Sequence, residues 1–315
     1  MSITALNSAI SGLKAAQKSL DNIATNIANA SNTDYTRKIL PQETQVIAGE
    51  GVGVSLGAVR RTVDKALLRD LMSQIGVSNN RETLQTFLSR VQSFHGASES
   101  NSSITAALSG LKDSFTQLSS APDNVNNLTK TLTSARVLAT KFNELSDMIT
   151  RLRSETEEQI KSAVEAVNTA LKKVAEANSL IESQNARGQS TAEAEDTRDA
   201  AMKVVAQFLE IRSFPTENGK VTVVTKDGYT LADTSARLLS FNRSTLLPTS
   251  YYGDGNVGGL FVDGPTGTDV TDHDIGGSIG ALLQLRDQTL PTYQAQADEL
   301  AQKLAHRMSS QGLTL

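Results

Sequence analysis

The chain begins with a hydrophobic repeat of period seven. Mostly apolar residues recur in two neighbouring rows, Leu6, Leu13, Leu20 and Ile27 in one and Ile3, Ile10, Gln17 and Ala24 in the other. A seam sustained over nearly four heptads predicts a helix that packs against another helix. An isolated helix is marginal in water, so the partner must lie elsewhere in the chain or in another subunit. The alternative is an ordinary amphipathic helix within its own domain.

The polar residues around this seam predict how the helix meets water and where it ends. Lys14, Lys18, Asp21 and Asn22 form the other face, which we expect to be solvated. From Asn29 the sequence is rich in Asn, Ser, Thr and Asp, residues that favour caps and turns. We therefore expect the helix to end near Asn29.

Helical periodicity dominates the next part of the chain. Val52, Val54 and Leu56 alternate with small residues and predict a strand, which is followed by a helix through Val63, Ala66, Leu67 and Met72. From Asn79 to Ser183 the pattern is helical, with breaks at 96–103 and 121–123. The longest predicted helix has apolar positions three or four apart, typical of a nearly straight helix: Ile149, Leu152, Thr156, Ile160, Ala163, Val167, Leu171 and Val174. Its charged positions are interpreted as a solvated rim: Glu155, Glu157, Glu158, Lys161, Glu165, Lys172 and Lys173.

The pattern changes between residues 211 and 275. The turn signals Asn218-Gly219 and Asp227-Gly228 separate short apolar runs that predict strands, at Val221, Val223 and Val224 and then at Tyr229 and Leu231. A helix returns from residue 276, with an apolar side made of Ile279, Leu282, Leu283, Leu290, Ala297, Leu300 and Leu304. The predicted fold is mainly α with an inserted β-rich domain (α+β, multidomain). We expect an N-terminal heptad helix and turn at 1–50, a long-helix rod domain at 51–210 completed by 276–315, and the β-rich insertion at 211–275.

Composition narrows the classes of function. The 315 residues include no cysteine, which excludes a disulfide, a thiolate nucleophile and a cysteine-ligated metal. The net charge of -4 argues against a nucleic-acid binder, which usually has a basic face. The sequence has no apolar run long enough for a transmembrane helix and no basic region followed by an apolar run at its start. We therefore expect neither membrane insertion nor a cleaved Sec-type signal peptide.

Candidate chemistry is sparse. The three histidines, His95, His273 and His306, lie far apart in the sequence, and no catalytic motif of a hydrolase, phosphate-binding loop or zinc protease is present. A loop that gathers Asp269, Asp272, His273 and Asp274 could hold a divalent ion through its carboxylate oxygens, but the spacing fits no EF-hand, so a solvated acidic loop is preferred. Gly51, Gly53 and Gly57 miss the dinucleotide fingerprint by one residue. We predict no catalytic, cofactor or metal site.

Four segments resemble one family. The stretch NIATNIANASNTDYTRK resembles the N-terminal signature of bacterial flagellar axial proteins, which are rod, hook and hook-associated proteins; Asn26, Ile27, Asn29, Ala30, Tyr35, Thr36 and Arg37 match it. Asp34 stands where the family usually has a glycine with φ > 0. GVGVSLGAVRRTVDKALL, DTRDAAMKVVAQFLEI…GYTLADTSARLL and GGSIGALLQLRDQTLP follow in the order seen in hook-associated members. Ala194 and Glu195 replace two family leucines just before the third segment.

This resemblance implies a structural subunit that joins hook to filament by polymerising into the axial tube. It implies export in an unfolded state through the flagellar type III apparatus with an export chaperone, an extracellular location in the flagellum, and contacts with hook protein, a second junction protein and copies of itself. No enzyme activity, cofactor, metal, nucleic acid or membrane insertion is expected. A rod or hook subunit is the nearest alternative, and an exported enzyme or effector using 211–275 is the alternative from another class. The residues expected to mediate assembly are Leu6, Leu13, Leu20 and Ile27, with Asn29, Tyr35 and Arg37 at the turn.

One feature of the family is missing from this sequence. The resemblance implies a second heptad helix at the C-terminus that pairs with the first one, whereas this sequence stops at MSSQGLTL. Either the chain is truncated or it departs from the family. Without that partner we expect the seam to be loose, mispaired or buried between molecules, and the isolated protein to be monomeric or weakly associating with a mobile first segment.

Overall fold

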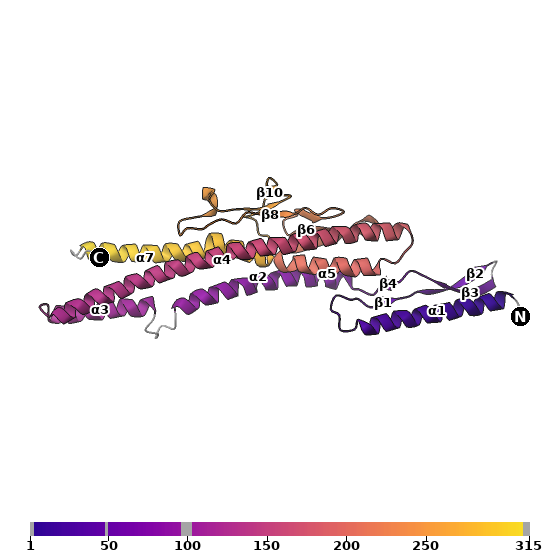
Figure 1. Cartoon of the computed structure of the whole chain (residues 1–315), viewed down its shortest axis with the longest axis horizontal. Helices are drawn as coiled ribbons and strands as arrows, with labels where there is room; N and C mark the ends of the chain where they lie inside the picture. The colour runs from indigo at the N-terminus through magenta and orange to yellow at the C-terminus, as the bar shows by residue number, and fades with distance from the viewer. Residues whose placement is uncertain (1–2, 48–49, 96–102, 311–315) are drawn as a thin grey trace.

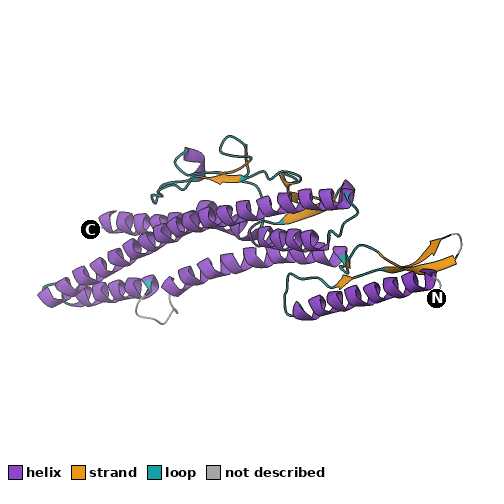
Figure 2. Ribbon diagram, turned by 45° about the vertical axis from the view of Figure 1, so that its right-hand side comes forward, coloured by secondary structure: helices purple, strands orange, loops and turns teal. Residues whose placement is uncertain are grey.

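The computed structural model describes residues 3–47, 50–95 and 103–310 as an elongated molecule (Figure 1). A helix with two small antiparallel strand pairs lies at one end, a bundle of long helices forms the body, and short sheets cover one side of the bundle (Figures 1 and 2). The predicted mainly α architecture with a small β part is therefore observed.

The N-terminal unit combines α1 (Ile3–Ala28) with four short strands. β2 (Gln42–Ile47) and β3 (Glu50–Leu56) form an antiparallel hairpin, and β1 (Lys38–Ile39) pairs with β4 (Arg60–Arg61). β3 packs against α1. The helix ends at Ala28, as the Asn- and Ser-rich sequence predicted. The boundary predicted at residue 50, in contrast, falls inside this unit, because the strands on both sides of it pack together.

Four helices carry the body of the molecule. α2 (Lys65–His95) is followed by α3 (Ile104–Ser120), by the 62-residue α4 (Val125–Ala186) and by α5 (Ala192–Phe208). Ser103 caps α3 because its hydroxyl accepts a hydrogen bond from the Ala106 N–H at 3.0 Å. The break predicted at 121–123 separates α3 from α4, whereas the break at 96–103 lies almost wholly outside the described residues.

The core of the bundle runs along α4. All eight positions predicted from the helical spacing are buried: Ile149, Leu152, Thr156, Ile160, Ala163, Val167, Leu171 and Val174. They pack with α2, α5 and the returning helices, which are α6 (Gly277–Gln284), a π-helical turn (Leu285–Thr289) and α7 (Leu290–Ser310). The apolar side predicted for the helix that begins at residue 276 is wrong at Leu300, which is 49% exposed. The helix predicted to include Val63 starts only at Lys65.

Two three-stranded antiparallel sheets lie beside α4. The first contains β5 (Ile211–Pro215), β6 (Val221–Thr225) and β7 (Thr230–Ala232); the second contains β8 (Leu239–Phe241), β9 (Leu260–Val262) and β10 (Thr268–Asp269). Two asparagine side chains of α4 attach these sheets to the helix. The Asn178 amide donates to the carbonyls of Val221 and Asp233, at 2.8 and 2.6 Å, and Asn168 exchanges two 2.8 Å hydrogen bonds with Leu239.

A buried ion cluster joins α4, the π-helical turn and the loops of the second sheet. Arg286 is fully buried, and its guanidinium donates to Glu157 at 2.7 Å and to the adjacent Asp287 at 2.8 and 2.7 Å. Arg153 of α4 donates to the Arg286 carbonyl at 3.1 Å. The backbone N–H of Ser244 donates to Glu157 at 2.6 Å. Glu157 therefore belongs to the core, and its assignment to a solvated rim was wrong.

Candidate assembly surface

The heptad seam of α1 faces away from the rest of the chain. Leu6, Leu13, Leu20 and Ile27 are 54%, 72%, 66% and 71% exposed, and Ile10 and Ile23 beside them are 44% and 51% exposed. The helix therefore presents an apolar stripe to solvent from Leu6 to Ile27, whereas the side chain of Ile3 lies outside the described part of the chain.

The opposite face of α1 is small and polar, and this is the face that packs. Ser8 donates to the Val52 carbonyl at 2.7 Å, and the Val54 N–H donates to the Ser11 hydroxyl at 3.1 Å. Farther along, the Gln42 amide donates to the Ser19 hydroxyl at 2.7 Å. Hydrogen bonds to and from serines on one face of the helix therefore attach the hairpin to it.

Gly53 allows this close approach. Its φ of +146° is unfavourable for other residues, and a Cβ at this position would lie 2.3 Å from the Ser11 Oγ. The glycines that suggested a phosphate loop therefore include one that is needed for the contact between helix and hairpin.

Asn26 organises the turn after α1. Its side-chain oxygen accepts hydrogen bonds from the Tyr35 hydroxyl at 2.8 Å and from the Lys38 N–H at 2.9 Å. Its amide donates to the Lys38 carbonyl at 2.9 Å, and Asn22 donates to the same carbonyl at 3.0 Å. Asn22, expected to meet water, is therefore bound to the turn.

The other predicted turn residues contribute less. Asn29 donates to the Thr25 carbonyl at 3.0 Å, one helical turn back. Arg37 is exposed, and it is its backbone carbonyl that accepts a hydrogen bond, from the Thr62 N–H at 2.9 Å. Asp34 does not adopt the positive φ expected from the family glycine. The turn is therefore shaped chiefly by Asn26 and Tyr35.

A cluster of ion pairs connects this N-terminal unit to α5. The side chain of Arg61 is 5% exposed; its Nε lies 2.7 Å from Glu195 and its NH1 2.9 Å from Asp196. Its NH2 lies 2.8 Å from Asp199, close enough for an ion pair but not aligned as a hydrogen bond. Burial alone would lower the pKa of Arg61, but Asp199, Asp196 and Glu195 together raise it above its ordinary value.

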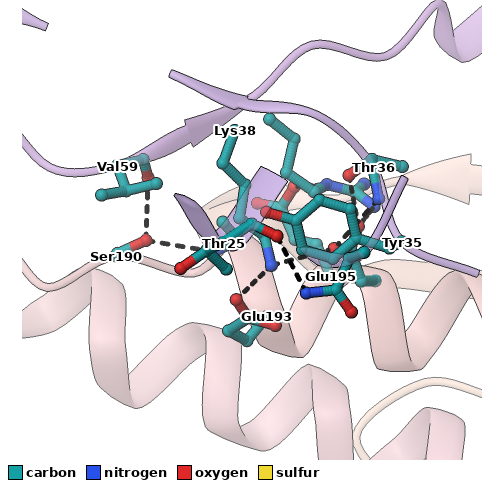
Figure 3. A network of polar contacts seen from close by, with 12 residues as sticks. Thr25, Tyr35, Thr36, Lys38, Val59, Ser190, Glu193 and Glu195 are labelled. Carbon is teal, nitrogen blue, oxygen red and sulfur yellow. Dashed lines mark hydrogen bonds and ion pairs between the residues drawn. The ribbon is translucent and has the colours of Figure 1, made fainter. Parts of the chain in front are cut away.

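Lys38 makes the second connection. Its buried ammonium contacts Glu193 and lies 3.3 Å from Asp196, and it also stands 4.2 Å from the centre of the Tyr35 ring. Figure 3 shows Lys38, Tyr35 and Thr36 facing the first turns of α5. We call Lys38, Arg61 and the four α5 carboxylates the polar joint. The sequence analysis did not predict the polar joint, although Asp196 and Asp199 lie in a segment that resembles the family. Glu195, which replaces a family leucine, is a partner of Arg61.

The acidic loop has protein partners of its own. The Asp269 carboxylate accepts hydrogen bonds from Tyr252 and Thr271, and Asp274 pairs with Lys226 at 2.5 Å. Among residues 3–47, 50–95 and 103–310, no group of three or more His, Cys, Asp or Glu side chains is arranged to hold a metal ion. None of the helices formed by these residues has the length and apolarity to cross a bilayer.

Comparison with known proteins identifies the family. Residues 88–314 match the model of the flagellar hook-associated protein FlgK helical domain, and this range is more than half of the chain. The chain belongs to the FlgK family. This match favours a hook-associated protein over the alternative of a rod or hook subunit, although those subunits share the N-terminal signature.

Curated FlgK relatives match beyond the helical domain. The chain is 24% identical to flagellar hook-associated protein 1 of Salmonella typhimurium over 316 residues and to that of Escherichia coli over 320 residues. Each alignment covers 97% of this chain and 56% of the relative. The chain therefore spans about half the length of the curated relatives it matches, and the alignments extend into the N-terminal unit.

A solved FlgK structure shares the fold. The flagellar hook junction protein FlgK from Burkholderia pseudomallei superposes with a TM-score of 0.62 at 19% identity, covering 75% of this chain and 43% of that chain. This likeness supports the mainly α architecture with small sheets.

Proposed function

We propose that this chain is a structural subunit of the bacterial flagellum, acting as a hook-associated protein 1 that joins hook to filament. The observation that carries the proposal is the exposed apolar seam of α1, on a helix whose polar face is already bound to its own hairpin. A helix with one face occupied and the other face apolar is built to be covered by another helix.

The energy of covering the seam is large compared with the stability of a domain. Full burial of a Leu or Ile side chain contributes about 1.5–3 kcal/mol. Since Leu6, Leu13, Leu20 and Ile27 are 54–72% exposed, about 1–2 kcal/mol remains available at each of them. The four residues together offer about 4–8 kcal/mol, comparable with the whole free energy of unfolding of many domains.

The described chain does not provide the covering helix. α7, the last helix described, lies toward the opposite end of the molecule from α1 (Figure 1). In the proposed assembly, therefore, helices of neighbouring subunits cover the seam. α1 lines the inner tube, and residues 211–275, which lie on one side of α4, face outward.

The polar joint has a positional role in this proposal. Arg61 and Lys38 hold the N-terminal unit against α5 through contacts that depend on direction and charge. The orientation of α1 relative to the bundle is thereby fixed before a neighbour arrives, which lowers the entropy cost of assembly.

The remaining parts of the proposal follow from the family. The chain would be exported unfolded through the flagellar type III apparatus with an export chaperone and without a cleaved signal, and would contact hook protein, a second junction protein and copies of itself outside the cell. The absence of cysteine suits passage of an unfolded chain, since no disulfide has to be opened. The proposed role requires no cofactor and no catalysis.

The test begins with deletion of the full-length gene in its host. A junction role predicts intact hooks without filaments, and flagellin released into the medium. Reintroduction of the gene restores filaments, whereas a gene carrying Leu13→Glu and Leu20→Glu does not, because two charges on the seam oppose its burial.

A matched control separates the seam from a general effect of charge. Asn7→Glu and Thr25→Glu add the same two charges to exposed positions on the flank of α1, and filaments should form normally. All variants should be secreted and should show unchanged helical circular dichroism. Normal filaments in cells with the two seam charges would refute the proposed role of α1.

A further inference from the structure

A small cavity lies where the start of α2, the first turns of α5 and the turn between β5 and β6 meet. Its volume is about 300 Å³, at the lower end of the range for ligand-binding pockets. Its floor is apolar and is formed by Leu68, Met72, Met202, Pro215 and Val221. It adjoins the polar joint, because Arg61 contributes to its wall.

Positive charge is concentrated around this cavity although the chain is acidic overall. Two carboxylates, Glu195 and Asp199, line it together with five cations, namely Arg61, Lys65, Arg69, Arg198 and Lys220. The lining therefore has an excess of three positive charges in a chain whose net charge is -4.

The available carboxylates are already engaged. Glu195 and Asp199 both contact Arg61, at 2.7 and 2.8 Å. Lys220 is paired outside the cavity with Glu182, at 2.8 Å. The charges of Lys65, Arg69 and Arg198 are therefore left without adequate compensation.

Arg198 shows this deficit most clearly. Its side chain is 7% exposed and its NH1 donates to the Gly219 carbonyl at 2.8 Å, but its Nε has no hydrogen-bond partner among the described residues. Asp199 Oδ1 lies 3.5 Å from that nitrogen, within ion-pair range only. Burial, the largest influence, lowers the pKa of Arg198 despite the attraction of nearby carboxylates.

Lys65 and Arg69 stand at the mouth of the cavity. They lie one turn apart on α2, both are exposed, and neither forms an ion pair within the part of the chain that the structure describes. Two like charges four residues apart on a helix repel each other, so an anion bound between them would be stabilised by both.

We propose that this cavity binds a carboxylate that carries a short apolar tail. The carboxylate would lie among Lys65, Arg69 and Arg198, and the tail would cover Leu68 and Val221, which are partly exposed. A free organic acid and a glutamate side chain of a neighbouring copy share this chemistry. A ligand of this kind uses both the positive charge and the apolar surface of the cavity, since a simple anion would leave Leu68, Pro215 and Val221 in contact with water.

Calorimetric titration of the 315-residue chain with hexanoate tests the proposal, with inorganic phosphate and 1-hexanol as partial ligands. We expect saturable binding of one hexanoate per chain, and binding of phosphate and of hexanol at least tenfold weaker. The Lys65→Gln/Arg69→Gln variant should bind hexanoate at least tenfold more weakly. Both side chains are exposed, so this variant should fold, which its circular dichroism and thermal unfolding will establish.

The control variant is Arg151→Gln/Lys161→Gln, which removes two exposed cations of α4 that lie away from the cavity; its affinity should be unchanged. Failure of hexanoate to bind, equal binding of hexanol, or an unchanged affinity in the Lys65/Arg69 variant would each overturn the proposal. Sedimentation with saturating hexanoate distinguishes the sources. If hexanoate reduces self-association in the unmodified chain and not in the Lys65/Arg69 variant, the carboxylate belongs to a neighbouring copy; unchanged sedimentation assigns the site to a free acid.

Discussion

Replacing Arg61 tests whether the polar joint holds the N-terminal unit. Arg61→Met keeps an unbranched apolar stem and removes the charge that contacts three carboxylates. The adjacent Arg60 lies on the exposed side of the same short strand and forms no ion pair among the described residues. Arg60→Met is therefore a matched control: it makes the same substitution at the neighbouring position, on the opposite face of the strand.

The magnitude follows from the burial of the carboxylates that remain. Asp196 and Asp199 are 9% and 8% exposed, so removal of Arg61 leaves two nearly buried negative charges. Loss of one partner of a buried pair costs about 3–5 kcal/mol. Lys38 stays 3.3 Å from Asp196 and Arg198 stays 3.5 Å from Asp199, so we expect the lower end, about 3 kcal/mol. Arg60→Met should change stability by no more than about 0.5 kcal/mol.

Native-state hydrogen exchange measures this effect where it arises. A loss of about 3 kcal/mol corresponds to a decrease in protection of roughly 100-fold. We expect that decrease at residues 36–39 and 60–62, with little change in α4. Adding Asp199→Asn to Arg61→Met should recover part of the protection, because it removes one of the uncompensated charges. Equal protection in Arg61→Met and Arg60→Met would refute the assigned role of the joint.

Three further changes probe other parts of the structure. Glu157→Gln should lower the free energy of unfolding by about 3 kcal/mol in urea, followed by circular dichroism, because it removes one of the two carboxylates that pair with the fully buried Arg286 guanidinium; an unchanged midpoint would contradict the buried cluster. Gly53→Val should cost about 2 kcal/mol and reduce exchange protection in the hairpin, since its side chain would collide with Ser11 at an unfavourable φ; full protection would contradict the close contact between helix and hairpin. The Ser235 N–H, together with other donors, lowers the pKa of Asp233 below 3.8, so this contribution to stability is complete above the unfolded pKa and is lost as pH falls through the folded one. A carboxyl NMR titration with a midpoint at or above 3.8 would contradict it.

The sequence predicts best those features that depend on local periodicity. The buried positions of α4 follow from spacings of three and four residues, and Ile149 and Val174 at the two ends of that pattern are both 1% exposed or less. The end of α1 at Ala28 follows from the intrinsic preference of Asn29 and its neighbours for turns. Such signals require no knowledge of which elements meet in space.

The buried ion pairs that the sequence did not reveal join residues that are distant in the sequence. Glu157 occupies a helix position where a charge is usually solvated, and its partner Arg286 is 129 residues away. Arg61 meets Glu195 across a separation of 134 residues. Pairs of this kind are created by the topology of the chain, so helical periodicity alone could not reveal them. The matched family segments that contain Arg61, Asp196 and Arg286 were the only signal that these residues act together.

The two faces of α1 explain how a helix with an exposed apolar seam can keep a fixed orientation relative to its hairpin. The inward face is attached by one hydrogen bond that Ser8 donates and by two that Ser11 and Ser19 accept, each of which contributes about 1 kcal/mol net and depends strongly on geometry. Burial of the outward apolar face would contribute about 4–8 kcal/mol, and this contribution depends little on direction. Contacts within the chain thus set the orientation of the helix, whereas in the proposed assembly most of its stability would come from the helices that cover Leu13 and Leu20. We therefore expect a subunit arranged in this way to associate weakly alone and to gain further stability on joining the assembly.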